Sequence, residues 1–524
     1  MDIKTIHTTF RNAISLLASG KVKNALEQTT VLANALQFGD YNAMCADLHT
    51  NYRYMLQYYI DGIIDPDRKR VYNKLVAKLF TMLWEIREEL MQRDSPTYEY
   101  SQKRYFYAKK NSIRYNTFAP AFADYYAKRQ AIDESESEEI ETEKIKENRK
   151  EFEDRLPDFF AIFWLATHYG NEEKELLQQI INNEKAGIIE KSLLVSGLTL
   201  NLWRMFDETK LMLLLDCCNI DDQKTRQRAL VGLCFVLARY NRFIPYFPVI
   251  RNRLVLMADD EKFVGYFRNI FIQIISTLET VVIARRMSDE ILPELIKLAP
   301  QIKSKMEAEN ILQSEDWEEE NPEWQEFIEN SSVGEKLQEI SELQVEGADV
   351  YMGTFATLKI FPFFGEICNW FLPFDTETLA VYDLFDTADN TLMHAFAGHS
   401  GMCNSDKYSF CLSMNQMSKK DRNKLKKQLK NETEQLEEIT RDESLLTPDL
   451  ATKNLSKIYV QDLFRFFKLY PARGDFSDMF QMALIMHKSY LFDILAVNNT
   501  ELKTAVAEYY FAKKHYRQAL DLLL

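Results

Sequence analysis

A segment in the middle of this chain repeats its apolar pattern 35 residues further on, so that residues 175–206 match residues 210–241. Each copy has the period of an apolar helix, a short polar turn and a second apolar helix. The shift places like residues together: Leu176 on Leu211, Ile180 on Leu215, Val195 on Leu230, Gly197 on Gly232 and Leu202 on Leu237. Glycines at matching places allow two helices to approach closely. Repeated hairpins bury their apolar faces only against neighbours, so the repeat predicts a stack of helix pairs.

Scarce glycine and proline extend this expectation to the rest of the chain. Of 524 residues, 15 are glycine and 13 are proline, whereas average usage is about 7% and 5%. Folds rich in strands and tight turns need more of both residues. The apolar fraction of 46% is ample for a packed core. We therefore predict an all-α fold, an α-solenoid of stacked helical hairpins with an irregular, aromatic-rich insert.

Two known helical repeats resemble parts of this sequence. The 175–241 repeat resembles the HEAT class, whose period is about 40 residues. Residues 501–524 resemble a tetratricopeptide repeat in the spacing of four small and aromatic residues: Ala507, Tyr510, Tyr516 and Ala519. The opening segment has similar spacings at Ala13, Leu16, Val22 and Ala25. Both segments lack the consensus Trp and Pro. The resemblance implies packing roles for these residues, and no ligand-contacting position carries over.

We expect five parts along the chain. They are N-terminal helical hairpins, faintly tetratricopeptide-like, over 1–130; a charged linker or helix over 131–155; HEAT-like repeats over 156–343; the irregular insert over 344–415; and C-terminal helices ending in a tetratricopeptide-like unit over 416–524.

Charge and cysteine usage limit the compartment and the partners. The net charge is −15, and an acidic surface repels phosphate backbones, so nucleic-acid binding is not expected from the chain as a whole. The seven cysteines include no C-x-x-C pair, as is typical of buried free thiols in a reducing compartment. The N-terminus has no signal-peptide core, and no apolar run approaches the ~20 residues of a membrane span. We predict a cytoplasmic protein with no membrane partner.

The segment 344–415 breaks the helical period. It holds five of the fifteen glycines and a run of aromatic residues from Phe361 to Phe374. An irregular structure with a short strand pair is expected here. Exposed aromatic residues in irregular structure often bind partners, and buried ones fix an insert to its own protein. Both interpretations stay open, and the candidate partner-binding residues are Phe364, Trp370 and Phe371.

An enzyme with a site in the segment 394–411 is the first alternative. This segment gathers His394, His399, Cys403 and Cys411. Zinc sites use four such ligands, usually as two closely spaced pairs, and only one such pair occurs here. Asp406 and Glu366 would supply carboxylates for acid–base chemistry if they were buried together. The chain has no G-x-x-x-x-G-K-[ST], G-x-G-x-x-G or H-E-x-x-H motif, so we predict no cofactor and no metal.

A nucleic-acid-associated regulator is the second alternative. Seven lysine and arginine residues lie between 419 and 430, but an acidic run follows at once and no aromatic residue is interleaved. A solvated helix that pairs with its acidic neighbour is the favoured interpretation.

The predicted function is that of a non-catalytic scaffold or adaptor that binds a protein or peptide. Stacked helix pairs form an extended concave surface that holds peptides or helices. The final hairpin ends on Leu522, Leu523 and Leu524 and so lacks the polar outer face of a capping repeat. We expect either that another element covers this face or that the chain is the N-terminal part of a longer repeat protein. The partner and the oligomeric state are not predictable from the sequence.

Overall fold

The structure is a computed structural model that describes residues 1–37, 39–133, 138–183, 186–291, 293, 349–385, 401–418, 422, 448–497 and 499–524. Within these residues every regular element is a helix and no strand occurs, so the all-α prediction is confirmed. All seven cysteines are buried free thiols, as the sequence predicts.

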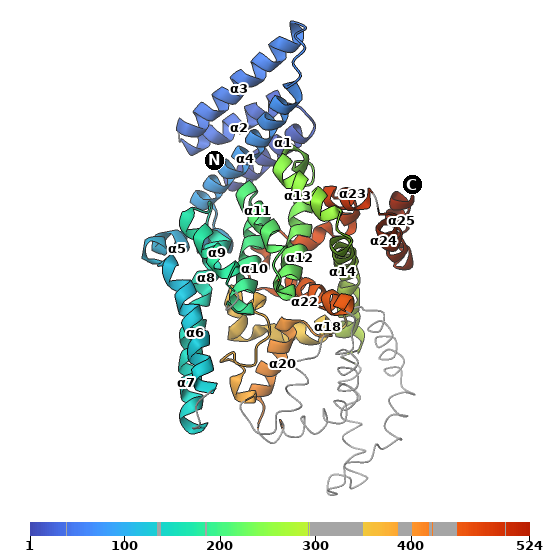
Figure 1. The fold of residues 1–524 in the computed structure, drawn as a ribbon. Helices are drawn as coiled ribbons and strands as arrows, with labels where there is room; N and C mark the ends of the chain where they lie inside the picture. The colour runs from blue at the N-terminus through green and yellow to red at the C-terminus, as the bar shows by residue number, and fades with distance from the viewer. Residues whose placement is uncertain are drawn as a thin grey trace.

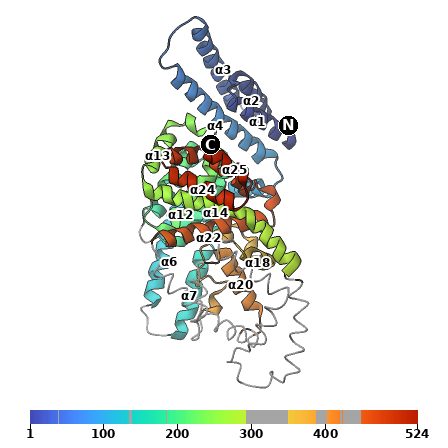
Figure 2. The same cartoon turned by 90° about the vertical axis from the view of Figure 1, so that its right-hand side faces the viewer.

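Four N-terminal helices form one end of the molecule (Figures 1 and 2). They are α1 (Ile3–Ala18), α2 (Val22–Leu36), α3 (Gly39–Ile60) and α4 (Arg68–Asp94). Helices α1 and α2 pack as a hairpin about Gly20, and α4 lies across both of them. Helix α3 packs on α2 and α4, and its connection to α4 lies at the outer extremity of this end.

The middle of the chain is a long series of helices. They are α5 (Tyr98–Lys109), η1 (Lys110–Ser112), η2 (Tyr115–Thr117), α6 (Phe118–Asp133), α7 (Glu138–Glu153), α8 (Leu156–Leu165), α9 (Asn171–Ile181), α10 (Ile188–Arg204), α11 (Glu208–Cys217), α12 (Gln223–Arg239), η3 (Ile244–Tyr246), α13 (Pro248–Ala258), α14 (Glu261–Arg286) and η4 (Met287–Ile291). Helices α6 and α7 form a pair that extends away from the centre of the molecule (Figure 1). Most of the predicted charged segment 131–155 is therefore helix.

The sequence repeat corresponds to two helix pairs, α9–α10 and α11–α12. The second helix of each pair packs on the previous one, so that α8, α10 and α12 lie in a row. A methyl group added at Gly197 would lie 3.2 Å from the backbone nitrogen of Trp164 in α8, and one added at Gly232 would lie 2.3 Å from Thr199 Oγ1 in α10. Trp164 and Thr199 are themselves 35 residues apart, so the two close approaches are equivalent.

The insert is irregular, as predicted, but the predicted strand pair is wrong for its described residues. These residues form short helices: α18 (Tyr351–Phe355), η6 (Ala356–Ile360), η7 (Pro362–Gly365), η8 (Ile367–Phe371), η9 (Tyr382–Leu384) and α20 (Asn404–Gln416). The buried aromatic residues Phe364, Trp370 and Phe371 come from the two successive 3₁₀ helices η7 and η8, a helix type that occurs in short pieces. The insert contacts α8, α10 and α14, so it is part of the body of the protein.

The C-terminal helices pack mainly on α12, α13 and α14 from the middle of the chain. They are α22 (Pro448–Leu469), η10 (Arg473–Asp475), η11 (Met479–Lys488), α23 (Tyr490–Ala496), α24 (Thr500–Ala512) and α25 (Tyr516–Leu523). Helix α22 packs against both α12 and α14 (Figure 1). Helices α24 and α25 form the predicted last hairpin, with Ala507, Tyr510 and Ala519 buried. Tyr516 does not fill the space between these helices, because 57% of it is exposed.

Helix α14 is, of the described helices, the one long and apolar enough to cross a bilayer by length and composition alone. Half of its most apolar window is buried within the protein, as in the core helix of many globular folds. Its faces pack on α22, α24 and η11. This is weak evidence for a membrane span, and the cytoplasmic location stays a prediction.

A buried charge network joins α4, α5 and α10 beneath the N-terminal helices. Glu88 Oε1 accepts hydrogen bonds from Lys103 Nζ at 2.5 Å and from Arg204 Nε at 2.7 Å, and Glu88 Oε2 accepts one from Tyr100 at 2.8 Å. Burial acts to raise the pKa of Glu88, but the charges of Lys103 and Arg204 outweigh it and hold that pKa well below its usual range. The carboxylate is therefore the form that the folded chain stabilises.

Replacing Glu88 with glutamine is expected to lower stability at neutral pH and to reduce acid sensitivity. A carboxyl whose pKa is depressed by folding stabilises the folded state above its unfolded pKa of about 4.3, and this contribution is lost as the pH falls below that value. In urea unfolding, the midpoint of Glu88→Gln should lie below that of the wild type at about pH 7, and the difference between the two midpoints should be smaller at pH 3. The exposed control Glu27→Gln should follow wild type at each pH, and a constant deficit for Glu88→Gln would contradict the prediction.

Candidate functional site

The three aromatic residues predicted to contact a partner are buried. Phe364, Trp370 and Phe371 each have 0% exposure. The Trp370 indole Nε1 donates to the Phe364 carbonyl at 2.9 Å, and the Phe371 ring stacks on Phe160 of α8 at a centroid distance of 5.6 Å. Trp370 also meets the ring of Tyr470, just after α22, at 5.9 Å. These side chains pack the insert onto its own protein, and their role in partner binding stays a prediction.

Asp406, in the segment 394–411, was a candidate for acid–base chemistry, and in the structure it forms a buried ion pair. Asp406 is fully buried, with Oδ2 2.8 Å from Arg465 Nη2 and Oδ1 2.9 Å from Lys359 Nζ. Burial acts to raise the pKa of Asp406, yet the two cations hold it well below its usual range. A carboxylate held in this way is a poor proton donor or acceptor near neutral pH. Glu366 has a different position, where its side chain accepts from the backbone N–H of Ile367 at 3.1 Å.

The metal and nucleic-acid alternatives fall partly outside the described residues. His394 and His399 lie outside them, and Cys403 and Cys411 are both buried. In the part of the chain that the structure describes, no group of three or more His, Cys, Asp and Glu side chains is placed to hold a metal ion. The basic run 419–430 is also outside the described residues except for Arg422, which donates to the Asn415 carbonyl at 3.3 Å.

The N-terminal end of the molecule carries a groove between α3 and α4, which we call the α3–α4 groove. Its volume is about 600 Å³. It is lined by Leu48, Asn51, Tyr54, Met55, Tyr58, Ile63, Asp65, Arg68, Val71, Lys74, Leu75 and Lys78. The residues on each helix recur at intervals of three and four, which places them on one face of that helix. Each helix contributes eleven residues from first to last, so the groove is about 15 Å long.

Helix α3 packs on α2 and α4 but buries few of its own residues within the described chain. Only Cys45 and Leu48 of its 22 residues are buried. Tyr54 and Tyr58 are 54% and 52% exposed, and Ile64 in the following turn is 95% exposed. Contiguous exposed apolar side chains of this kind are typical of interaction surfaces.

The α3–α4 groove has an apolar floor and a basic wall. Leu48 and Leu75 are buried and form part of the floor, and the two exposed tyrosines line the α3 side. Arg68, Lys74 and Lys78 line the α4 side, against a single carboxylate in the lining, that of Asp65. Asp65 Oδ1 is itself bonded to the backbone N–H of Asp67 at 2.8 Å. The groove is therefore positively charged in a chain whose net charge is −15.

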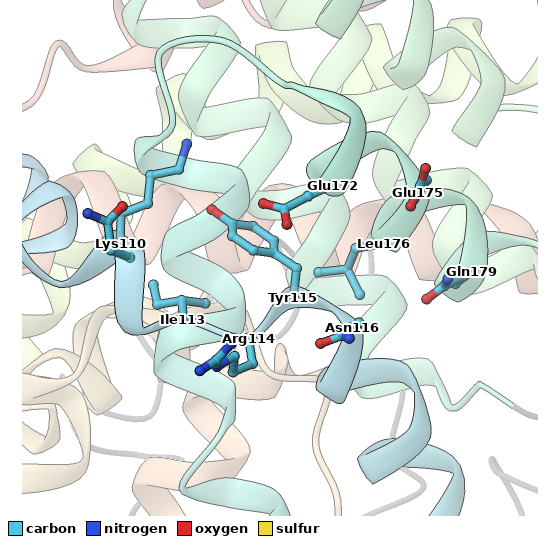
Figure 3. A pocket seen from close by; sticks show the side chains of 10 residues that line it. Lys110, Ile113, Arg114, Tyr115, Asn116, Glu172, Glu175, Leu176 and Gln179 are labelled. Carbon is cyan, nitrogen blue, oxygen red and sulfur yellow. The ribbon is translucent and has the colours of Figure 1, made fainter.

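A second pocket lies between the 110–117 segment and α9, and the contacts around it serve the structure of α9. Figure 3 shows Lys110 and Arg114 on one side, facing Glu172, Glu175 and Gln179 of α9. Beneath it the buried Glu173 accepts hydrogen bonds from Lys110 Nζ at 3.0 Å and from the Tyr115 hydroxyl at 3.2 Å. Glu173 also caps the first turn of α9, since its Oε2 accepts from the Gly170 N–H at 2.9 Å. Charges of both signs and little exposed apolar surface leave this pocket without an anchor for a partner.

The groove residues were not predicted as a site from the sequence, although a signal for them exists. In the segment Tyr52–Ile64, nine of the thirteen residues are apolar or aromatic, more than the single stripe that an ordinary amphipathic helix needs. This excess predicts either a central helix or an exposed apolar surface. Only the packing of α1, α2 and α4 decides between these, because in the described part of the chain it leaves every residue of α3 except Cys45 and Leu48 at least partly exposed.

No protein-family model matches this chain. No curated protein and no solved structure matches it either. The resemblance to HEAT and tetratricopeptide repeats therefore rests on the residues named above, and the function is inferred from the site itself.

Proposed function

We propose that this chain is a non-catalytic protein-binding scaffold whose α3–α4 groove holds an acidic amphipathic helix of a partner protein. The observation that carries this proposal is the exposed apolar groove with lysines and an arginine along one wall. An amphipathic helix lays its apolar face into such a groove through residues spaced i, i+3, i+4 and i+7. Acidic side chains beside these anchors would meet Lys74, Lys78 and Arg68.

The proposed architecture around the groove is an α-solenoid-like stack of helical hairpins. The row α8, α10 and α12 with its equivalent glycine contacts supports this proposal, and so do the hairpins α1–α2 and α24–α25 at the two ends of the chain. Helix α22 departs from a simple stack, because it packs against α12 and α14 from a distant part of the sequence. A rigid body of this kind would present the α3–α4 groove at one end, away from the insert.

The charge of the groove favours an acidic partner over a basic or neutral one. Complementary charges steer association and exclude partners of like sign. The chain as a whole has more acidic than basic residues, 79 against 64. The groove lining has the opposite balance, with three basic residues and one acidic residue. The cationic head groups lie at the rim, because Lys74 and Lys78 are exposed, while the apolar floor supplies most of the buried area.

Selection of helical peptides on the full chain tests this function. From a displayed library of peptides about 14 residues long, ~21 Å as a helix, we expect enrichment of sequences with apolar residues at i, i+3 or i+4 and i+7 flanked by Asp and Glu. Lys74→Glu/Lys78→Glu and Tyr54→Ala/Tyr58→Ala should each weaken the selected peptides at least tenfold, about 1.4 kcal/mol, by fluorescence anisotropy.

A matched control keeps the change in charge and moves it out of the groove. Lys4→Glu/Lys23→Glu alters two exposed lysines on α1 and α2 and should leave the affinity within about twofold of wild type, by the same anisotropy measurement. Failure to enrich any peptide, enrichment of basic peptides, or equal binding to Lys74→Glu/Lys78→Glu would each reject the proposal.

A further inference from the structure

A third cavity lies where α1, α4, α10 and α12 meet the 474–477 segment, and its volume is about 240 Å³. Three arginines from three helices line it: Arg87 of α4, Arg204 of α10 and Arg239 of α12. The floor is buried, with Arg204 and Trp203 each 5% exposed, whereas Gly474, Asp475 and Ser477 at the rim are exposed to solvent. The cavity is therefore closed below and open on one side.

Two of these arginines have buried donor atoms without partners. Within the described residues, Arg87 Nη1 and Arg239 Nε are buried and make no hydrogen bond, and the same is true of the indole Nε1 of Trp84. The Trp84 ring is near both guanidinium groups, at 5.5 Å from Arg87 Cζ and 5.7 Å from Arg239 Cζ. Buried donors are nearly always paired in native proteins, so three unpaired donors around one ring call for an acceptor.

The carboxylates near the cavity are already committed to other groups. Glu88 Oε1 is 2.7 Å from Arg204 Nε, and Glu99 Oε1 is 3.2 Å from Arg204 Nη1. Asp475 Oδ2 accepts the backbone N–H of Tyr98 at 2.7 Å. Arg204 is thus neutralised, while Arg87 and Arg239 make no ion pair with a carboxylate of the described chain.

The Arg239 guanidinium donates from Nη1 to Ser477 Oγ at 3.3 Å, but neither it nor Arg87 has a carboxylate partner among the described residues. The two groups also act on each other and on a histidine at the same cavity. Burial lowers the pKa of Arg239, and the charge of Arg87 lowers it further, against the opposing effects of Tyr240 and Glu99. Burial lowers the pKa of His7 as well, with added contributions from Arg87 and Arg11. Like charges held together at a half-enclosed site create a positive potential that favours an anion.

We propose that this cavity binds the oxyanion group, a carboxylate or a phosphate, of a small organic ligand, with Arg87 and Arg239 as its binding residues. The planar guanidinium presents paired N–H donors that match either oxyanion. Trp203, whose ring lies 4.2 Å from Arg239 Cζ, offers an apolar surface beside the anion and holds the guanidinium in place. The small volume limits the group within the cavity to a few heavy atoms. This site is independent of the α3–α4 groove.

Calorimetric titration of the full chain with three probes tests the proposal: inorganic phosphate, acetate and benzoate, each at matched ionic strength. We expect saturable binding of at least one probe, with a Kd below about 1 mM, ~4 kcal/mol of binding free energy. Arg87→Gln and Arg239→Gln should each weaken that binding at least tenfold. The matched control Arg93→Gln, also on α4 and paired at the surface with Asp94, should bind as wild type does.

The outcomes separate the possible sources of the anion. Binding of phosphate alone assigns a phosphorylated ligand, and binding of acetate or benzoate assigns a carboxylate. The proposal is overturned if none of the probes binds saturably to the wild-type chain. It is also overturned if the binding is unchanged in Arg87→Gln. Circular dichroism establishes that each variant is folded, and if Arg239→Gln does not fold, Arg87→Gln and the wild-type titration decide the question.

Discussion

Replacing Arg465 with methionine is expected to reduce the free energy of unfolding by about 3–5 kcal/mol. The Arg465 side chain is 1% exposed and lies near the C-terminal end of α22. Its Nη2 atom donates to Asp349 Oδ1 at 2.8 Å and to Asp406 Oδ2 at 2.8 Å. Methionine has a similar reach but no donors, so both carboxylates would lose a buried cation. The cost comes from the uncompensated charges rather than from lost contacts.

Urea unfolding of three variants measures this effect. Arg465→Met/Asp349→Asn removes one of the two stranded carboxylates and leaves Asp406 paired with Lys359 at 2.9 Å, so it should recover about half of the loss. Lys468→Met, on the same helix, removes a partly exposed pair with Asp478 and should cost less than about 1 kcal/mol. A loss below about 1 kcal/mol for Arg465→Met would show that the charge network is not what holds α22 to the insert.

This network explains how the insert belongs to the fold. Asp349 lies at the start of the described insert, Asp406 lies in α20, and Arg465 lies in α22. The backbone of the insert adds a further bond, since Arg228 of α12 donates to the Phe371 carbonyl at 2.6 Å. Arg228 also lies over the ring of Tyr459 in α22 at 4.3 Å. Buried polar groups thus fix the position of a segment that has little regular structure of its own.

Replacing Gly232 with alanine is expected to destabilise the protein by about 1–3 kcal/mol. The added methyl group would lie 2.3 Å from Thr199 Oγ1 and 3.0 Å from Thr199 Cγ2. Thr199 is fully buried and donates to the Val195 carbonyl at 2.8 Å, so it has little freedom to move aside. Helices α10 and α12 would have to separate, and the row of second helices would lose its close packing.

A double-mutant cycle isolates this contact. Thr199→Ala removes both atoms nearest to the new methyl group, so Gly232→Ala/Thr199→Ala should be more stable than the sum of the single changes predicts. The control Gly265→Ala lies in α14 with no atom within 4 Å of the added group, and it should raise stability by about 0.5–1 kcal/mol. Additive single effects in thermal and urea unfolding would contradict the close approach of α10 and α12.

The sequence by itself determined the helical class of this protein and the contact between its repeated helices. Apolar residues at helical intervals and scarce glycine and proline are local properties, and they predict helices without knowledge of the fold. The match of Gly197 with Gly232 predicted a close approach, and both glycines lie at equivalent helix contacts. Buried free cysteines followed in the same way from the absence of paired spacings.

Only the tertiary structure decided which apolar and charged residues are exposed. Phe364, Trp370 and Phe371 were predicted to contact a partner and are buried, whereas Tyr54 and Tyr58, for which no site was predicted, are exposed. These outcomes depend on contacts between segments far apart in the chain, such as Arg204 with Glu88, 116 residues away. Periodicity reports which face of a helix is apolar, but what covers that face is set by distant elements whose arrangement no local pattern encodes.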